Sequence, residues 1–261
     1  MRKIVGFGDS FCQFEHSISN TVVSYTGEML NIPVLNLGTS GSSITHAMTK
    51  FTEYYQGTEY SADDIIIFFI TGDTRIYAVD MPPHIGWTPF HYMADSKLYN
   101  VPGSVDPISS QWLKKNGKDA AWAIENLYMS NLNYEFVKML SFLKVFANAN
   151  ISNTIIVLPS IDLGTHPELL KVCTPSKNFF PLLDFPLLTI SINEFSDSHI
   201  LNYATHTMKE KRVNHLSKVN RMILAKLLAN IIAIKSTAEY SCDIFKTHIY
   251  NSIAEYDNYT E

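Results

Sequence analysis

The sequence predicts an α/β protein, a three-layer αβα sandwich built on a mostly parallel sheet. Short apolar runs, bounded by Gly, Asp or Ser, alternate along the chain with longer segments that have helical apolar spacing. The last of these segments has the most regular apolar face, and such a face needs a sheet to lie on. Strands that alternate with helices are typical of parallel sheets whose two faces are both covered.

Four apolar runs are predicted to be buried strands, because each is too short to be a helix. The four runs are Lys3–Phe7, Val34–Leu37, Ile65–Ile70 and Thr154–Leu158. The fourth run is followed directly by Pro159, which favours the end of a strand at that point. Runs of this kind, apolar throughout rather than alternating, indicate strands that are buried on both faces.

Helices are predicted between and after these strands. Asn20–Leu30 and Ile44–Tyr55 are expected to be crossover helices, and Ala120–Asn148 is a longer, apolar-rich helical pattern. A final helix is predicted from apolar residues at i, i+4 spacing. These residues are Val219, Ile223, Leu227 and Ile231, with Leu224, Leu228 and Ile232 beside them.

We expect residues 1–261 to form a single domain, because this length is close to the upper limit for one hydrophobic core. Two stretches break the alternation of strands and helices. An irregular insertion is predicted at about residues 77–118, where Pro and Gly are frequent, and Asp162–Leu188 is a second irregular stretch. Aromatic residues of the insertion can line a pocket or form a small core of their own. The tail, about residues 236–261, has no assigned structure.

Composition excludes several classes of protein. Hydrophobic residues make up 46% of the chain, which excludes global disorder. The 20 basic and 25 acidic residues give a formal charge of −5 without any long basic run, so we expect neither nucleic acid nor a membrane as a partner. A signal-peptide core would be interrupted by Asp9, which favours a cytoplasmic location. Three scattered cysteines predict no disulfide framework or zinc site, and we expect no metal or cofactor.

A serine follows the first predicted strand, in the string Gly6-Phe7-Gly8-Asp9-Ser10-Phe11. Ligands of open α/β sheets bind outside the carboxyl ends of the strands. A serine at a tight turn into a helix is exposed there, and it can attack a carbonyl if a base removes its proton. An ordinary strand–helix turn explains the same string equally well.

The same glycines allow a second interpretation, a nucleotide-binding α/β domain. Gly6 and Gly8 match the first two positions of a dinucleotide fingerprint, whereas Phe11 occupies the third glycine position. Such a domain also needs an acidic residue about 20 positions further on, to bind the ribose. Glu28 lies at that distance, within a predicted helix.

Three further strings follow predicted strands or precede the last helix. Asn36-Leu37-Gly38-Thr39-Ser40-Gly41-Ser42-Ser43 has small residues that let a backbone N–H group approach a ligand, although a plain Gly/Ser turn explains them too. Thr71-Gly72-Asp73-Thr74-Arg75 is either part of a site or a solvated loop. In Asn214-His215-Leu216-Ser217, Ser217 is a candidate helix N-cap, which puts His215 on the preceding loop.

Together, the order and spacing of these four blocks resemble the SGNH hydrolases, also called the GDSL family. Ser10 in the block Gly8-Asp9-Ser10-Phe11 corresponds to the family's nucleophile. Gly41 corresponds to the glycine whose backbone N–H helps to hold the oxyanion, and His215 to the general base. The resemblance implies a flavodoxin-like SGNH hydrolase fold and a serine esterase that acts on acyl esters, O-acetyl groups on carbohydrate being one common substrate class.

Two blocks depart from the family pattern. In the family, the third block usually reads Gly-x-Asn-Asp, and its Asn completes the oxyanion hole. Alignment on Gly72 puts Thr74 at the Asn position and Arg75 at the Asp position. A shift of the alignment by one residue puts Asp73 at the Asn position instead. An ionised Asp73 would repel an oxyanion, so Thr74 and Arg75 are the better candidates.

The fourth block lacks the acid that normally lies three residues before the histidine. That position holds Arg212, and Asp197 and Glu210 are the candidate replacements, with a backbone carbonyl as a further way to orient the imidazole. Loss of a well-placed triad acid can cost about 10⁴ in rate. The alternative interpretation is therefore a catalytically degenerate SGNH-like module that binds carbohydrate or has a structural role. The sequence leaves the oligomeric state open.

Overall fold

The computed structural model describes residues 1–9, 11–13, 20–39, 42, 44–70, 132–149, 153–159, 174–182, 216 and 218–235. Within these residues, five strands form one parallel sheet in the order β2-β1-β3-β4-β5. The strands are β1 (Ile4–Gly8), β2 (Val34–Asn36), β3 (Ile65–Ile70), β4 (Thr154–Pro159) and β5 (Phe179–Pro181). The four predicted strands are thus confirmed, each within about one residue of its predicted ends.

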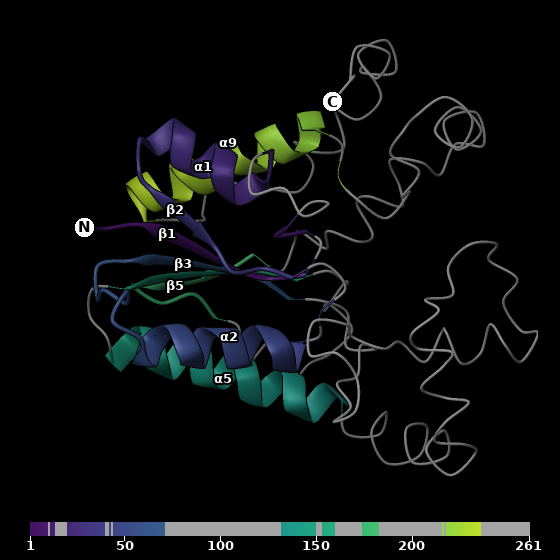
Figure 1. Cartoon of the computed structure of the whole chain (residues 1–261). Helices are drawn as coiled ribbons and strands as arrows, with labels where there is room; N and C mark the ends of the chain where they lie inside the picture. The colour runs from purple at the N-terminus through teal and green to yellow at the C-terminus, as the bar shows by residue number, and fades with distance from the viewer. Residues whose placement is uncertain are drawn as a thin grey trace, which may run out of the picture.

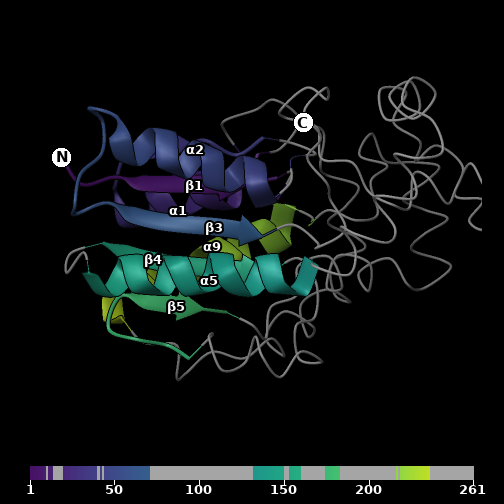
Figure 2. The same cartoon turned by 90° about the horizontal axis from the view of Figure 1, so that it is seen from below.

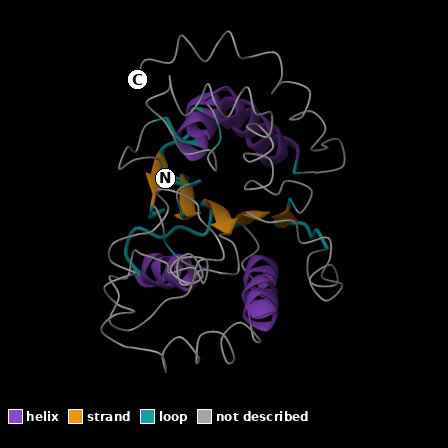
Figure 3. Cartoon of the chain, turned by 90° about the vertical axis from the view of Figure 1, so that its right-hand side faces the viewer, coloured by secondary structure: helices purple, strands orange, loops and turns teal. Residues whose placement is uncertain are grey.

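In the described part of the chain, α-helices cover both faces of this sheet (Figures 1 and 3). Helices α1 (Val22–Leu30) and α9 (Lys218–Ile234) pack side by side on one face. On the other face, α2 (Ile44–Gln56) lies along β1, and α5 (Leu132–Ala149) lies along β4 and β5 (Figure 2). This arrangement confirms the predicted three-layer αβα sandwich, and the strand order is that of flavodoxin-like folds.

Alternate residues of each strand supply the two halves of the core. In β1, Ile4 packs with the cluster under α1 and α9, whereas Val5 and Phe7 belong to the cluster under α2 and α5. The six residues of β3 divide in the same way, and all are buried. Successive side chains of a strand point to opposite faces, so a sheet with two covered faces needs apolar residues at every position.

The strand order places a topological switch point between β1 and β3. From β1 the chain passes to β2 on one side, and from β2 it crosses back to β3 on the other side. The helices that leave the carboxyl ends of β1 and β2, α1 and α2, accordingly lie on opposite faces of the sheet (Figure 1). In open α/β sheets the crevice at such a point is where ligands bind.

One strand was not predicted. β5 lies within Asp162–Leu188, which the sequence analysis assigns as irregular, and only the part from 174 to 182 of this stretch is described. The strand has three residues and ends in Pro181, and proline normally argues against a strand. It is tolerated here because, among the described strands, β5 lies at the edge of the sheet, where it pairs with β4.

The helix boundaries agree with the prediction where they are described. α1 begins after Thr21, whose side chain and that of Ser24 form a reciprocal capping box, and Asn20 has a left-handed φ of 65°. α5 covers the second half of the predicted Ala120–Asn148, whose first half lies outside the described residues. The predicted insertion at about 77–118, the tail at about 236–261 and the Ser217 cap also lie outside them. In the described parts of the chain, no helix is long and apolar enough to cross a membrane.

A buried carboxylate holds the amino edge of the sheet together. Asp64, fully buried just before β3, accepts hydrogen bonds from the backbone N–H groups of Lys3 and Ser61, both at 2.9 Å, and from the Tyr54 hydroxyl. The ammonium group of Lys3 lies 3.2 Å from the same carboxylate. The adjacent carbonyl of Asp64 accepts from the Asn153 amide at 2.9 Å. β1, the turn before β3, and β4 are thereby fixed at one point.

We expect Asp64→Ala to lower the free energy of unfolding by about 3 kcal/mol, because it leaves several buried donors without an acceptor. The matched control is Asp63→Ala, which changes the exposed neighbouring carboxylate and should alter stability by about 0.5 kcal/mol or less. Urea denaturation of both variants measures the difference. Equal midpoints for the two variants would show that the amino edge does not depend on this carboxylate.

Candidate active site at the carboxyl edge of the sheet

The structure describes the neighbours of the predicted site residues rather than the residues themselves. Outside the described residues lie Ser10, Gly41, Asp73, Thr74, Arg75, Asp197, Glu210 and His215. Described residues adjoin Ser10 and Gly41, after β1 and β2, and His215, just before α9, whereas β3 ends three residues before Asp73.

A buried aspartate organises the turn that follows β1. Asp9 is only 1% exposed, and its Oδ1 accepts a hydrogen bond from the backbone N–H of Phe11 at 3.0 Å. Its carbonyl accepts from the N–H groups of Cys12 at 3.0 Å and Gln13 at 2.9 Å. This is the bonding pattern of an N-cap residue with the first turn of a helix. The chain on both sides of position 10 is thus held by one residue.

Asn36, the last residue of β2, joins this turn to the second block. Its amide nitrogen donates to the carbonyl of Cys12 at 2.8 Å, and its Oδ1 accepts from the Cys12 thiol at 3.1 Å and from the Gly38 N–H at 3.0 Å. The side chain therefore bonds to both strand–helix connections at once. We call this set of bonds between Asn36, Cys12 and Gly38 the Asn36 clamp.

Gly6 in the first block and Gly38 in the second block are required by internal packing. A Cβ atom on Gly38 would lie 2.6 Å from the Cβ of Cys12, and one on Gly6 would lie 2.8 Å from both the Cys12 sulfur and a Val23 methyl. Cys12 therefore fills the space beside Gly38, and for this glycine the structure favours the plain Gly/Ser turn over the close approach of a ligand. Core side chains likewise fill the space beside Gly6. The lack of a side chain at Gly6 is therefore explained by packing and needs no bound dinucleotide.

The loop between β2 and α2 is attached to the end of β1. The carbonyl of Gly8 accepts two hydrogen bonds, from the Thr39 N–H at 2.8 Å and from the Ser42 hydroxyl at 3.1 Å. The Ser42 N–H in turn donates to the Thr39 carbonyl at 3.0 Å. Ser42 is fully buried. Thr39 and Ser42 stand on either side of Gly41 in the sequence, so the flanks of the first and second blocks meet here.

Sequence reasoning missed one residue beside this loop. His46, the third residue of α2, is 6% exposed, and its Nε2 lies within hydrogen-bonding distance, 3.3 Å, of the Thr39 hydroxyl. No motif spacing singles it out, because it lies within the predicted helix and not on a loop. The one available signal is a histidine in the first turn of an otherwise apolar, core-facing pattern.

The third block follows a strand that ends at this edge, and the fourth block is next to a residue of the core. Gly8 pairs with Phe69 in the sheet, and β3 ends one residue later, at Ile70. Leu216, which follows His215, is 5% exposed and belongs to the same core cluster as Phe11, which follows Ser10. The sequence neighbours of the predicted nucleophile and of the predicted base are thus buried in one cluster, on the α1 and α9 face.

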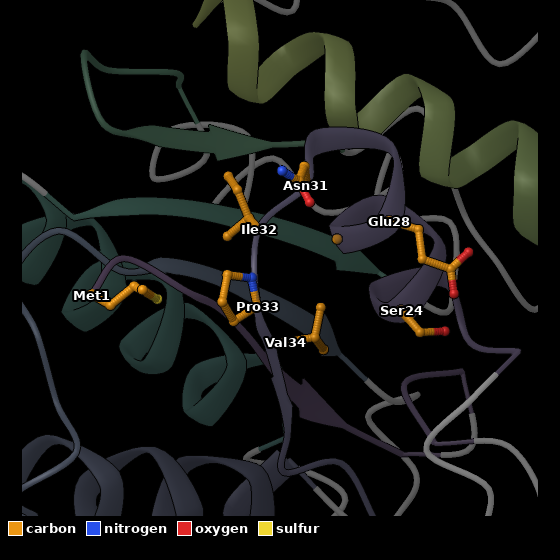
Figure 4. A pocket seen from close by; sticks show the side chains of 8 residues that line it. Met1, Ser24, Glu28, Asn31, Ile32, Pro33 and Val34 are labelled. Carbon is orange, nitrogen blue, oxygen red and sulfur yellow. The ribbon is translucent and has the colours of Figure 1, made fainter.

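Glu28, the acidic residue that the nucleotide-binding interpretation requires, lies at the opposite edge of the sheet from the candidate site. Glu28 lies in the last turn of α1 and lines a groove of about 600 Å³ together with Met1 and Pro33, which precede β1 and β2 (Figure 4). This groove is at the amino edge of the sheet. A nucleotide whose phosphates lay at the carboxyl edge could not reach Glu28 with its ribose. Glu28 therefore cannot be the ribose-binding acid that the nucleotide-binding interpretation requires.

No group of three or more His, Cys, Asp or Glu side chains within the described ranges is arranged to hold a metal ion. The thiol of Cys12 is free and buried. Its burial, and then the charge of Asp9, raise the pKa of this thiol well above its usual value near 9. The thiolate is the reactive form of cysteine, so Cys12 is a packing residue here rather than a nucleophile.

Comparison with known proteins gives one structural likeness. No family model and no curated protein matches the chain. A solved structure from Desulfitobacterium hafniense DCB-2, of a protein assigned to the lipolytic G-D-S-L family, aligns with 88% of this chain and 98% of its own, at 13% sequence identity and a TM-score of 0.38.

We expect Gly8→Ala to destabilise the protein by about 3 kcal/mol. Gly8 has a φ of 144°, which side chains rarely adopt, and its new Cβ would meet the Phe69 carbonyl and lie 2.7 Å from the Phe69 Cβ. The control is Gly57→Ala at an exposed position after α2, with an expected change of about 1 kcal/mol or less. Urea unfolding of the two variants measures the difference in the free energy of unfolding. A Gly8→Ala protein as stable as wild type would contradict the close approach of β1 and β3.

We expect stability to fall as pH rises above about 8.5, and Cys12→Ala to remove part of this fall. The pKa of Cys12 is raised in the folded state, so below the unfolded pKa both states keep the proton, whereas above it only the unfolded state releases it. Deprotonation therefore lowers the free energy of the unfolded state as the pH increases, and the free energy of unfolding falls. Denaturant titrations between pH 7 and pH 10 measure the slope; parallel slopes for wild type and variant would contradict the assignment.

Proposed function

We propose that this protein is a serine esterase of the SGNH type that hydrolyses acyl esters. Ser10 is the nucleophile and His215 is the general base. The observation that carries the proposal is that the chain neighbours of both residues, Phe11 and Leu216, belong to one buried cluster on the face covered by α1 and α9, and that Phe11 follows the carboxyl end of β1. In a flavodoxin-like sheet this is also the edge at which ligands bind.

In the proposed reaction, His215 takes the proton of Ser10 as the hydroxyl attacks the ester carbonyl. The protonated imidazole then gives this proton to the leaving alcohol, and an acyl-enzyme is left on Ser10. Water, activated by the same base, hydrolyses the acyl-enzyme. Either Asp197 or Glu210, or a backbone carbonyl, orients the imidazole in the place of the missing acid at Arg212.

The oxyanion of the tetrahedral intermediate is held by backbone N–H groups in this proposal. The groups are those of Ser10 and Gly41, helped by Thr74 or Arg75 from the third block; Asp73 would contribute only if protonated. Support comes from the bonds on either side of the first two groups. Asp9 holds the turn around position 10, and the Gly8 carbonyl holds Thr39 and Ser42, which flank Gly41.

The substrate class in the proposal is a small-molecule or carbohydrate ester, an O-acetyl group on carbohydrate among them. A cytoplasmic location and the absence of nucleic-acid, membrane, metal and cofactor requirements remain predictions from the sequence. The alternative is a module of this fold that has lost catalysis and binds carbohydrate, which the missing Asp-x-x-His pattern favours.

A fluorophosphonate probe tests the proposal without knowledge of the substrate. We expect an adduct on Ser10, mapped by peptide mass spectrometry, and its loss in Ser10→Ala and in His215→Ala. Ser10→Ala should also abolish hydrolysis of p-nitrophenyl acetate while the thermal midpoint stays within a few degrees of wild type. The control is Ser61→Ala, a serine at the opposite edge of the sheet, which should keep full labelling.

Two results would decide against esterase activity. Labelling or turnover that survives in Ser10→Ala would remove Ser10 as the nucleophile. A wild-type protein that is not labelled, under conditions that label a control esterase, would favour the binding module instead. In that case, carbohydrate binding should be unaffected by Ser10→Ala.

A further inference from the structure

The loop after β2 is attached to two different elements of the fold. Two hydrogen bonds attach it to the Gly8 carbonyl at the end of β1, one from the Thr39 N–H and one from the Ser42 hydroxyl. A third contact joins the Thr39 hydroxyl to Nε2 of His46 in α2. Thr39 is therefore held through its backbone by the sheet and through its side chain by a helix.

His46 is a rigid support for this contact. It lies in the first turn of α2, and its side chain is 6% exposed. The same helix is anchored further along by Phe51 and Tyr54, which are 1% and 6% exposed and make edge-to-face and tilted ring contacts with Phe7 of β1. A buried imidazole on an anchored helix has little freedom to follow a moving loop, so its position limits where Thr39 can lie.

We infer that His46 is a positioning residue of the active site, which acts through Thr39 on the loop that carries the Gly41 N–H. The inference rests on the proposed function, in which this N–H stabilises the oxyanion. In this scheme His46 is neither the nucleophile nor the base. Its effect is on the geometry of a donor, and donors to an oxyanion must be held within a fraction of an ångström to be effective.

The expected kinetic signature follows from when the oxyanion exists. It forms only in the transition state and the intermediate, so a misplaced donor lowers kcat and leaves KM nearly unchanged. Removal of an oxyanion donor costs about 10² to 10³ in kcat, and a loosened donor should cost less. We expect His46→Leu to lower kcat for p-nitrophenyl acetate about tenfold or more, and to slow phosphonylation of Ser10 by the fluorophosphonate probe by a similar factor.

Conservative variants separate positioning from bulk packing. His46→Gln keeps a nitrogen able to reach the Thr39 hydroxyl and should recover most of kcat, whereas His46→Leu keeps the volume without the polar group. Thr39→Val removes the hydroxyl and should reproduce the loss, and Thr39→Ser should restore it. Thr49→Val, on the exposed side of the same helix, is the control for a threonine-to-valine change and should keep wild-type kcat.

The double variant His46→Leu/Thr39→Val tests whether the two side chains act through one contact. Its loss in kcat should equal that of either single variant, rather than the product of the two losses. If His46→Leu fails to fold, the Thr39 pair gives the answer alone: loss in Thr39→Val with recovery in Thr39→Ser supports the inference, and wild-type kcat in Thr39→Val overturns it.

The outcomes also distinguish this inference from the proposed function. A wild type that is labelled on Ser10 and hydrolyses the ester, together with a His46→Leu variant of unchanged kcat and labelling rate, overturns the inference and leaves the esterase. Equal losses in His46→Leu and His46→Gln also overturn it, because the polar contact would then be irrelevant. A wild type that is neither labelled nor active overturns both.

Discussion

The carboxyl edge of this protein depends on the close approach of Gly8 to β3. The absence of a side chain lets the β1 backbone lie against Phe69, and the φ of 144° turns the chain out of the strand at the point where the first block begins. The carbonyl of the same residue then accepts both bonds that hold the loop after β2. One residue thus sets the spacing of β1 and β3 and the position of the neighbouring loop.

The two edges of the sheet are fixed by different means. At the amino edge, the buried Asp64 carboxylate accepts hydrogen bonds from several different elements. At the carboxyl edge, the comparable bonds are made by backbone carbonyls, by the amide of Asn36 and by the buried carboxylate of Asp9. The amino edge thus depends on one shared acceptor, whereas the carboxyl edge depends on several separate ones.

Much of the fold could be predicted because its signals are local. β1, β3 and β4 are continuous apolar runs, and such runs occur where both faces of a parallel sheet are covered. β5 escaped prediction because its three residues and its proline carry no periodic signal; its pairing with β4 makes it a strand. Tertiary context, not local sequence, decides such short edge strands.

The candidate site was predictable as a set of positions but not as a set of bonds. Motif order predicts Ser10, Gly41 and His215 as site residues, whereas the contact between His46 and Thr39 joins residues that no motif connects. The Asn36 clamp was equally hidden, since it depends on Cys12, a residue that the sequence analysis considered only for disulfides and zinc. Packing partners of this kind are specified by the three-dimensional arrangement, which a single sequence does not display.

The bonds described at this edge come from one contiguous part of the chain, from β1 to the first turns of α2. Gly8, Asp9, Asn36, Thr39 and His46 are brought together by two short strand–helix units, so their arrangement is encoded locally. The first two predicted blocks lie within this part. The third and fourth blocks, around Asp73–Arg75 and Arg212, come from later segments. In the proposed site, the groups that depart from the resembled pattern are therefore added to this local scaffold, which keeps its own bonds. Under the proposed function, a replacement for the missing acid is thus compatible with an intact first half of the site.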